Sequence, residues 1–417
     1  MNPATFIFIL TYILVALGEN SPRKLDRPTA TLLGAVLMVA SGSLTRAEAR
    51  TAIDISTLAV LFGLMLLLNI LLTSGFPSWL AYRALNRCRS PQSLLALVIF
   101  CAGTASALML NDTVCLLGTP LLLEITAQFG VPAVPYLLAL ATSANIGSVM
   151  TLTGNPQDII IGQASAWTWS GFAVRMVPIG LLCLAANWLV LALLFRRQLA
   201  QVTLTQGPVS PPSSLQVDRG LAVKSLMVFT GLIIAFVLGL PMDFAAVAAA
   251  TLLLVLANRP PHEALIKVDW SLLLFFAGLF VVVQGFLKAD SQLLDILEGL
   301  TNALSEHLGL RQMALLSAAV VIGSNIFSNV PLVLTVSHWV DKMAHPQFLW
   351  LLLALTSTLA GNLTLFGSVA NVIVAQLAQR QAPVGFWDFL RVGIPVTIVT
   401  TGLGVVLLWA LAQFGWM

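Results

Sequence analysis

Two apolar stretches in opposite halves of the chain follow nearly the same pattern, so a fold built by the first half should recur in the second. Residues 54–72 and 269–287 align without a gap, with matches at Asp54 and Asp269, Ser56 and Ser271, Gly63 and Gly278, and Asn69 and Gln284. Residues 141–160 and 355–373 form a second pair, with matches at Thr142-Ser143 and Thr356-Ser357, Gly147 and Gly361, and, after a slip of one residue, Gly154 and Gly367. The chain therefore contains an internal repeat with polar, glycine-rich interruptions in each copy.

The composition indicates a membrane protein. Hydrophobic residues make up 58% of the 417 residues and charged residues 9%, which is too little charge to cover a soluble protein of this size. Several apolar stretches approach or exceed the ~20 residues that a helix needs to cross a bilayer. The basic residues stand in short clusters between these stretches, so the net charge of +3 does not point to nucleic acid. The four cysteines have no metal-ligand spacing, and we expect neither a disulfide framework nor a zinc site.

We predict an all-α membrane protein of about ten transmembrane helices, two re-entrant hairpins and a broken helix in each of two inverted-topology repeats. The first repeat covers 1–197, a cytoplasmic linker 198–221, and the second repeat 222–417. The predicted helices are 4–18, 29–43, 55–74, 135–168 (broken), 172–195, 222–239, 243–257, 270–287, 348–378 (broken) and 386–414. The hairpins are 91–129, entering from the inner side, and 311–343, entering from the outer side.

The loop charges predict the orientation. With both termini outside, nearly all short loops rich in Lys and Arg fall inside, as positive-inside bias requires. Each half then makes five crossings, an odd number, so the second copy enters from the opposite side. Two amphipathic segments, 76–88 and 291–310, precede the hairpins at equivalent places, and we expect them to be surface helices.

The turns of the two hairpins and the two helix breaks are the candidate functional sites. Irregular backbone at membrane depth must be satisfied by protein, water or a bound ion. The first turn holds Asn111, Asp112 and Thr113, and the second holds Ser328 and Asn329. The breaks run from Asn145 to Pro156 and from Gly361 to Ser368. Each restarted helix directs N–H groups at its break, which suits an anion. Two full crossings in place of each hairpin, and plain structural kinks, are the alternatives.

Ionisable residues inside apolar spans default to functional candidates. Asp112, at the tip of the first hairpin, is the strongest, and Asp158, in the first turn of the restarted helix, is next. Asp158 has the alternative role of complementing the helix dipole. We expect Glu124, Arg175 and Arg391 near the membrane interfaces.

These motifs resemble the ion transporter superfamily, which contains divalent anion/sodium symporters, citrate carriers and the arsenite-efflux membrane protein. The resemblance rests on Ser328-Asn329-Val330, which is close to the Ser-Asn-Thr-like hairpin signature of the family, and on Asn145-Ile146-Gly147 and Gly154-Asn155-Pro156 in the broken helix. Asn111-Asp112-Thr113, with Thr119-Pro120 after it, is more similar to the arsenite-efflux and citrate-carrier branch.

The resemblance implies one ion site per repeat, at a hairpin tip and the adjacent break. The first site would draw on Asn111, Asp112, Thr113, Gly147, Gly154 and Asn155, and the second on Ser328, Asn329, Gly361, Asn362, Gly367 and Asn371. The residues of the two breaks themselves add Asn145, Thr153, Asp158 and Thr364 to the candidates for substrate or ion binding. Na⁺ would be held at Asn111, Asp112, Gly147 and Asn155, and at Ser328, Asn329, Gly361 and Gly367. Where symporters have a neutral triplet this chain has Asp112, and a carboxylate at this depth can bind a proton, so H⁺ is the alternative coupling ion.

The expected function is secondary active transport of a small anion, either an inorganic oxyanion such as arsenite or a di/tricarboxylate, coupled to Na⁺ or H⁺ by alternating access. A Na⁺/H⁺ antiporter of the same fold and a passive channel are the alternatives. We expect no enzyme, since the apolar spans hold no nucleophile–base pair, and no cofactor besides the coupling ion. The expected partners are the small anion and the lipid bilayer of the cell (inner or plasma) membrane, without nucleic acid. A homodimer is an expectation of the family, and an ATPase subunit on a separate chain stays open.

Overall fold

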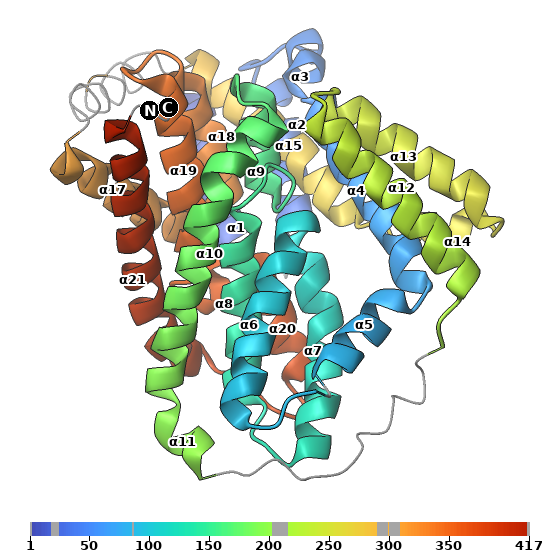
Figure 1. Ribbon diagram of the computed structural model, residues 1–417. Coiled ribbons are helices and arrows are strands. Elements are labelled where there is room, and N and C mark those ends of the chain that lie inside the picture. The colour runs from blue at the N-terminus through green and yellow to red at the C-terminus, as the bar shows by residue number, and fades with distance from the viewer. Residues whose placement is uncertain are drawn as a thin grey trace.

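The computed structural model describes residues 2–17, 25–85, 87–201, 216–289, 299 and 309–414, and in these parts of the chain the regular structure is helical (Figure 1). The first half contributes α1 (Pro3–Leu17), α2 (Arg27–Ala40), α3 (Arg46–Ala52), α4 (Ile55–Thr73), α5 (Phe76–Leu85), α6 (Pro91–Leu108), α7 (Asn111–Phe129), α8 (Val134–Ser148), α9 (Pro156–Ala164), α10 (Trp169–Leu194) and α11 (Arg196–Ala200). The second half contributes α12 (Arg219–Val237), α13 (Met242–Ala257), α14 (Pro261–Leu265), α15 (Trp270–Ala289), α17 (Leu310–Phe327), α18 (Asn329–Val340), α19 (Pro346–Ala360), the 3₁₀ turn η2 (Leu365–Gly367), α20 (Val369–Ala378) and α21 (Phe386–Gln413).

Seven helices within the described residues are long and apolar enough to cross a membrane, namely α4, α6, α10, α12, α15, α17 and α21. The described residues also contain five shorter apolar helices, namely α1, α2, α13, α19 and α20. This is the construction of a multi-pass membrane protein, as predicted. The helix α1 begins and the helix α21 ends at the same end of the molecule (Figure 1).

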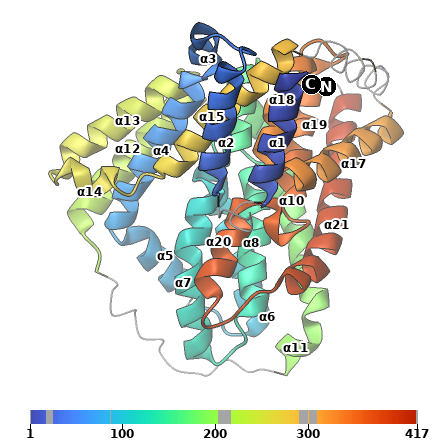
Figure 2. The same cartoon turned by 180° about the vertical axis from the view of Figure 1, so that it is seen from behind.

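Helices of one half pair with helices of the other. The helix α4 packs on α13, and α15 packs on α2 (Figure 2). Glycines at the matched positions of the repeat permit both contacts: a Cβ on Gly63 of α4 would lie 2.6 Å from the backbone of Ala246, and a Cβ on Gly278 of α15 would lie 2.7 Å from that of Thr31. The aligned glycines of the sequence thus mark two equivalent close approaches.

Most of the remaining helices form a second group, in which corresponding helices of the two halves pack in corresponding ways. The helix α6 packs on α8 as α17 packs on α19, α7 packs on α20 as α18 packs on α9, and α10 packs on α21. The upper ends of α6 and α7 lie well below the end of the molecule at which α3 and α13 lie (Figure 1). This pairing fits the predicted repeat, whereas its inverted relation to the membrane, the re-entry of the hairpins and the limits of the halves stay predictions.

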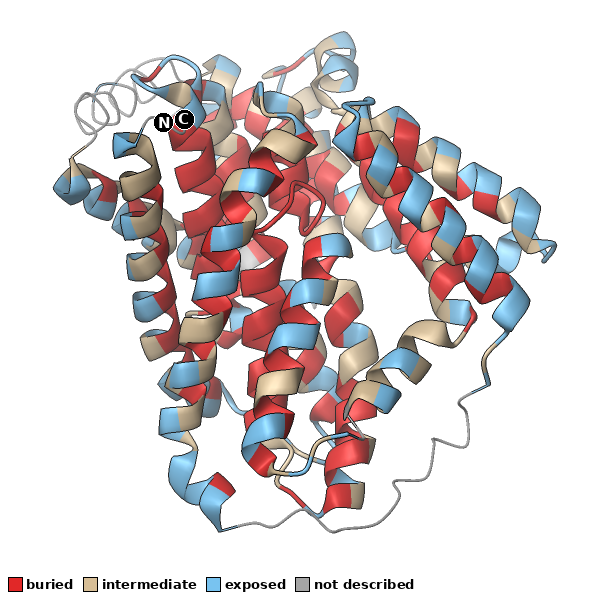
Figure 3. Ribbon diagram, viewed as in Figure 1, coloured by how far each residue is buried: buried red, intermediate tan, exposed pale blue. Residues whose placement is uncertain are grey.

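The core runs through α8 and α19. Every residue of α8 from Pro135 to Ser148, and of α19 from Phe348 to Ala360, is buried (Figure 3). The buried residues of both helices include polar ones. Because the two helices end at the breaks, the breaks lie in the centre of the molecule. Buried polar groups need partners there, because no water competes for them.

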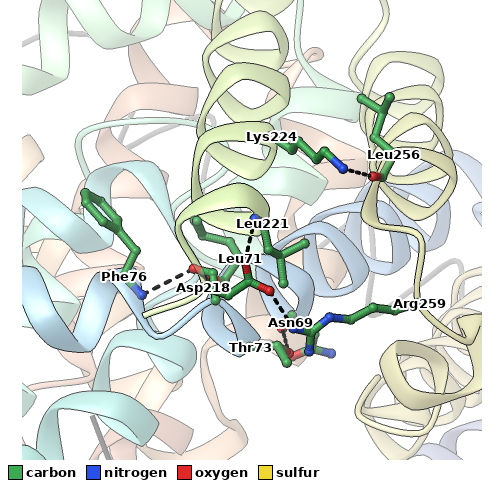
Figure 4. A network of polar contacts seen from close by, with 10 residues as sticks. Asn69, Leu71, Thr73, Phe76, Asp218, Leu221, Lys224, Leu256 and Arg259 are labelled. Carbon is green, nitrogen blue, oxygen red and sulfur yellow. Dashed lines mark hydrogen bonds and ion pairs between the residues drawn. The ribbon is translucent and has the colours of Figure 1, made fainter. Parts of the chain in front are cut away.

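A cluster of polar contacts holds the start of α12, the first helix of the second half, in place (Figure 4). The carboxylate of Asp218 caps α12 by accepting from the backbone N–H of Leu221 (3.0 Å) and pairs with Arg259 (2.7 Å), while its own N–H donates to the carbonyl of Ser74 (3.0 Å). Lys224 donates to the carbonyl of Leu256 at the end of α13 (2.8 Å). The start of α12 is thereby tied to the ends of α4 and α13.

Several boundaries differ from prediction in small ways. The helix α11 extends to Ala200 and α12 begins at Arg219, so both enter the predicted linker. Two short helices, α3 and α14, were not predicted, because they are charged and lie between apolar spans. The helix α5 coincides with the predicted surface helix 76–88. The second such segment, 291–310, lies almost wholly outside the described residues.

Candidate functional site

The predicted break in the first copy separates α8 from α9. The helix α8 ends at Ser148, and α9 begins at Pro156, whose missing N–H costs nothing in the first turn of a helix. Asn155 caps α9 by accepting from the backbone N–H of Asp158 (2.8 Å). In the second copy α19 ends at Ala360, and the chain passes through η2 before α20 starts at Val369. Both interruptions therefore lie where the sequence places them.

The tip of the first hairpin sits directly on the first break. The backbone N–H of Asn111 donates to the carbonyl of Gly154 (3.0 Å), and the hydroxyl of Ser106 donates to the carbonyl of Ala144 (2.6 Å). A Cβ on Gly147 would collide with the backbone of α6 at Gly103. Gly147 thus permits contact between the hairpin and the broken helix.

Asn145 joins both copies at one point. Its amide NH₂ donates to the side-chain oxygens of Asn362 (2.9 Å) and Asn371 (3.0 Å), both from the second copy. Its side-chain oxygen accepts from the amide of Asn111 (3.1 Å) and from the hydroxyl of Ser368 (2.9 Å). With 1% of its surface exposed, Asn145 makes four hydrogen bonds, which is the full capacity of an amide side chain.

The carbonyls freed by the second break are also satisfied by amides. Asn371 donates to the carbonyls of Gly361 (2.7 Å) and Thr364 (3.1 Å). Asn362 donates to the carbonyl of Thr142 (3.2 Å), on α8. We call the four asparagines 111, 145, 362 and 371 the central amide cluster.

A second polar group lies at the start of α9. The amide of Asn155 donates to the hydroxyl of Ser148 (3.0 Å), to the carboxyl of Asp158 (2.8 Å) and to the hydroxyl of Thr358 on α19 (3.2 Å). Gln157 also donates to Thr358 (3.3 Å). Asp158 is completely buried, and its Oδ1 has no hydrogen-bond partner.

The tip of the second hairpin has a different geometry. Ser328 has a positive φ of 75°, which a non-glycine residue rarely adopts. Asn329 is 7% exposed, and its Oδ1 has no partner. Asn325 holds the tip to the break, since its amide donates to the carbonyl of Ala360 (3.0 Å) and its oxygen accepts from the hydroxyl of Thr364 (3.0 Å).

The remaining predicted residues lie around these groups. Thr153 accepts from the indole N–H of Trp169 (3.1 Å) within the first break. Thr113 is half-buried near the start of α7. Gly367 lies beside Asn325: a Cβ there would be 3.0 Å from the Asn325 side-chain oxygen.

Asp112 is joined to the central amide cluster by its backbone, whose N–H donates to the side-chain oxygen of Asn111 (3.0 Å). Its side chain is half-buried, and the charges that act on it are those of Arg27, at the start of α2, and Asp269. Arg27 was not among the predicted site residues, because nothing in the order of residues shows that α2 begins near a hairpin tip.

The structure adds Ser148, Asn325, Thr358 and Ser368 to the predicted set. Ser148, Thr358 and Ser368 lie within a quoted break or beside a matched pair, and Asn325 lies three residues before Ser328 of the second hairpin turn; these positions are the signal that could have found them. Arg175 lies 4.6 Å from the ring of Trp167 and donates to the carbonyl of Gly171, and its place at a membrane interface stays a prediction.

A site for Na⁺ in this region would be formed mainly by uncharged oxygen atoms. The described residues contain no group of three or more His, Cys, Asp or Glu side chains that could hold a metal ion. Amide, hydroxyl and carbonyl oxygens are the donors present, and they are ligands that Na⁺ accepts. In the central amide cluster the side-chain oxygens of Asn145, Asn362 and Asn371 already accept hydrogen bonds. The oxygen of Asn145 accepts two hydrogen bonds, so a sodium ion there would have to displace one, whereas those of Asn362 and Asn371 accept one each from Asn145 and retain a lone pair for a ligand.

Interrupted helices that meet hairpin tips in the core of a many-helix membrane protein define a transporter rather than an enzyme. A sequence profile for a family described as citrate transporter matches residues 12–360. The chain belongs to the citrate transporter family.

Similar proteins span its whole length. The silicon efflux transporter LSI3 of Oryza sativa subsp. japonica is 31% identical over 92% of this chain and 92% of its own. The putative transporter arsB of Dictyostelium discoideum is 26% identical over 96% and 90%. The solved structure of the Alcanivorax borkumensis YdaH transporter superposes with a TM-score of 0.62 and 16% identity, covering 99% of this chain and 97% of that chain. At this identity the likeness to YdaH concerns the fold alone.

Proposed function

We propose that the protein is a secondary active transporter that moves a small, oxygen-rich anion by alternating access, driven by a gradient of Na⁺ or H⁺. The central amide cluster supports this proposal most strongly, because one residue, Asn145, is bonded to both copies of the repeat. A solute that replaced these hydrogen bonds would change the contacts of both copies at once. The group of hairpins and broken helices would then move against the group formed by α1–α4 and α12–α15.

The chemistry of this network favours a solute of low charge with several oxygens. Its side chains are amides and hydroxyls, and none of the side chains bonded in it is basic. The N-termini of α9 and α20 add only a partial positive charge. A tricarboxylate carries more negative charge than these groups can balance, and buried charge without a counter-charge is costly. An inorganic oxyanion or its weak acid, such as arsenite, fits better, and a di/tricarboxylate is the second choice.

The names of relatives support both choices. One relative is named as a silicon efflux transporter, which suggests a small hydroxylated solute, and the family is described as citrate transporter, which suggests a carboxylate. A Na⁺/H⁺ antiporter is the other candidate function, and the observation that favours it is the isolated, buried carboxyl of Asp158.

The test is transport by the purified full-length protein in liposomes. Arsenite, silicic acid, sulfate, phosphate, citrate, succinate and malate are each offered under an imposed pH gradient or sodium gradient. We expect concentrative movement of arsenite or silicic acid with one of the two gradients. Sodium–proton exchange without movement of any of the seven solutes would establish the antiporter instead, and movement that only dissipates gradients would establish a channel. A thermal-shift panel with the same solutes, with and without sodium, gives an independent measure of binding.

The cellular setting extends the proposal. We place the protein in the cell membrane with both termini outside, on the loop charges alone, and expect a homodimer formed through the α1–α4 and α12–α15 group. Cysteine labelling of intact cells at either end of the chain checks the orientation.

A further inference from the structure

The two restarted helices carry different residues at the same position. Four residues after the matched glycines Gly154 and Gly367, the chain has Asp158 in α9 and Asn371 in α20. Asn371 uses both protons of its amide to satisfy the carbonyls of Gly361 and Thr364 at its own break. A carboxylate has no proton to give, so the first copy lacks these two donors.

The surroundings of Asp158 do not compensate for its charge. The carboxyl has 0% exposure. Its Oδ2 accepts a single hydrogen bond, from the neutral amide of Asn155 (2.8 Å), and its Oδ1 accepts none. The hydroxyl of Thr358, on α19, also acts on the carboxyl, but it is neutral, and Oδ1 is left without a hydrogen-bond partner.

The helices that pack on α9 bring no counter-charge within the described chain. These helices are α4, α18 and α19. Within their bounds the only titratable side chain is His338 of α18, and its Nδ1 lies 3.0 Å from the carbonyl of Leu334 on its own helix. At their N-termini, Asp54 caps α4 by accepting from Thr57 and His345 precedes α19. An ionised carboxylate in this position would be an uncompensated buried charge, which is far more costly than a neutral carboxylic acid.

We propose that Asp158 carries the coupling proton of the transport cycle, and that its counterpart in the second copy, Asn371, stays permanently neutral. Asp158 is a carboxylic acid in the conformation described here, with the proton bonded to one carboxyl oxygen. When the break opens to water, that O–H bond breaks, water accepts the proton, and the carboxylate becomes hydrated. The claim that this proton is coupled to transport rests on the proposed function, whereas the protonated state of Asp158 does not depend on it.

The first test is infrared spectroscopy of the purified full-length protein in detergent at neutral pH. We expect the carbonyl stretch of a buried, protonated carboxylic acid, which shifts in heavy water, to be present in the wild type and absent from Asp158→Asn. The matched control, Glu124→Gln, changes a half-buried carboxyl of α7 outside the network and should keep the band. Identical spectra for the wild type and Asp158→Asn would overturn the proposal. If Asp158→Asn does not fold, Asp158→Glu must move the frequency of the band, and a stationary band refutes the assignment.

The second test measures coupling in liposomes with arsenite as the probe. Asp158→Asn should lower the ratio of pH-driven accumulation to equilibrium exchange at least tenfold, and Glu124→Gln should leave this ratio unchanged. An unchanged ratio in Asp158→Asn, or accumulation that follows sodium at fixed pH and is lost in this variant, contradicts proton coupling at Asp158. If the wild type moves no arsenite while the infrared band is present and assigned to Asp158, the transport of arsenite is refuted and the protonated site is retained.

Discussion

At the scale of single residues, the centre of the molecule depends on one amide. Asn145 donates to Asn362 and Asn371 and accepts from Asn111 and Ser368. Because the side chains of Asn111, Asn362 and Asn371 are buried, each of them loses a partner when Asn145 is shortened, whereas Ser368 is half-buried. A buried polar group that is left unsatisfied costs more than an average hydrogen bond gains.

Replacement of Asn145 by alanine should therefore destabilise the protein on the order of 3 kcal/mol, visible as a lower melting temperature in detergent. The matched control is Thr51→Ala, which removes an exposed hydroxyl bonded only to carbonyls of its own helix, and its melting temperature should stay at the wild-type value. Equal melting temperatures for Asn145→Ala and the control would show that water or another side chain fills the place of the amide.

At the scale of helices, pairs of glycines set how closely the two halves approach. Gly63 and Gly278 face the backbones of Ala246 and Thr31 at distances that leave no room for a methyl group. Gly231 of α12, by contrast, has no atom within 4 Å of the place where a Cβ would lie. The same substitution thus has different consequences on different helices.

Gly63→Ala and Gly278→Ala should each cost about 1–3 kcal/mol, the range found for overpacked interiors. Gly231→Ala should leave the stability unchanged or raise it slightly, since alanine is the better helix former. Thermal unfolding of the three variants in one detergent measures the difference. If Gly63→Ala had the same melting temperature as Gly231→Ala, the helices α4 and α13 would be able to move apart and accommodate the added methyl group.

The short helix α3 is held to α15 by an ion pair that depends on pH. The ion pair with Lys288, followed by hydrogen bonds from Thr45, lowers the pKa of Glu48 to about 2 from its usual value of 4.5. A lowered pKa means that the stabilisation is complete above pH 4.5 and is lost as the pH falls from there towards 2. Between pH 7 and 5 the contribution of this pair should thus be constant, so it should add no pH dependence to the melting temperature.

Glu48→Gln should flatten the acid limb of the melting curve below pH 4.5 and lower the melting temperature slightly at pH 7. Lys288→Gln should reproduce most of this effect, because Lys288 is the largest cause of the shift. An acid limb that is equally steep in the wild type and in both variants would assign it to other carboxyls.

At the scale of the whole molecule, two groups of helices meet across few polar contacts. Tyr12 of α1 is one of them: its hydroxyl donates to the carbonyl of Pro331 (3.1 Å) and lies 3.1 Å from the hydroxyl of Thr335, both on α18. If the groups move relative to one another during transport, this contact belongs to one conformation only. Its removal then shifts the balance between conformations, by as much as the bond contributes.

Tyr12→Phe should shift the equilibrium away from the described conformation by about fivefold, which corresponds to roughly 1 kcal/mol for one hydrogen bond. Spin labels at the exposed positions Val36 on α2 and Ile322 on α17 report the distance between the groups. A single distance in both the wild type and Tyr12→Phe, together with a lower melting temperature, would make the contact a static one.

Much of this architecture is visible in the sequence, since apolar length, matched glycines and broken periodicity are local signals. The breaks at Asn145–Pro156 and Gly361–Ser368, the hairpin turns and the surface helix α5 all follow from them. The partners at the site are not local: that Asn145 bonds Asn371, that Thr358 lies beside Asp158, and that Arg27 approaches Asp112 depend on how distant helices pack. A sequence without aligned relatives does not contain that information in readable form.

The position of Asn145 bears on how a duplicated gene can diverge. Its counterpart in the second copy is Leu359, by the same alignment that matches Gly147 with Gly361. Two identical copies would each bring an asparagine to a spot that accommodates one. An assembly of two first halves would bring two asparagines to the centre and an assembly of two second halves would bring none, so neither half can replace the other.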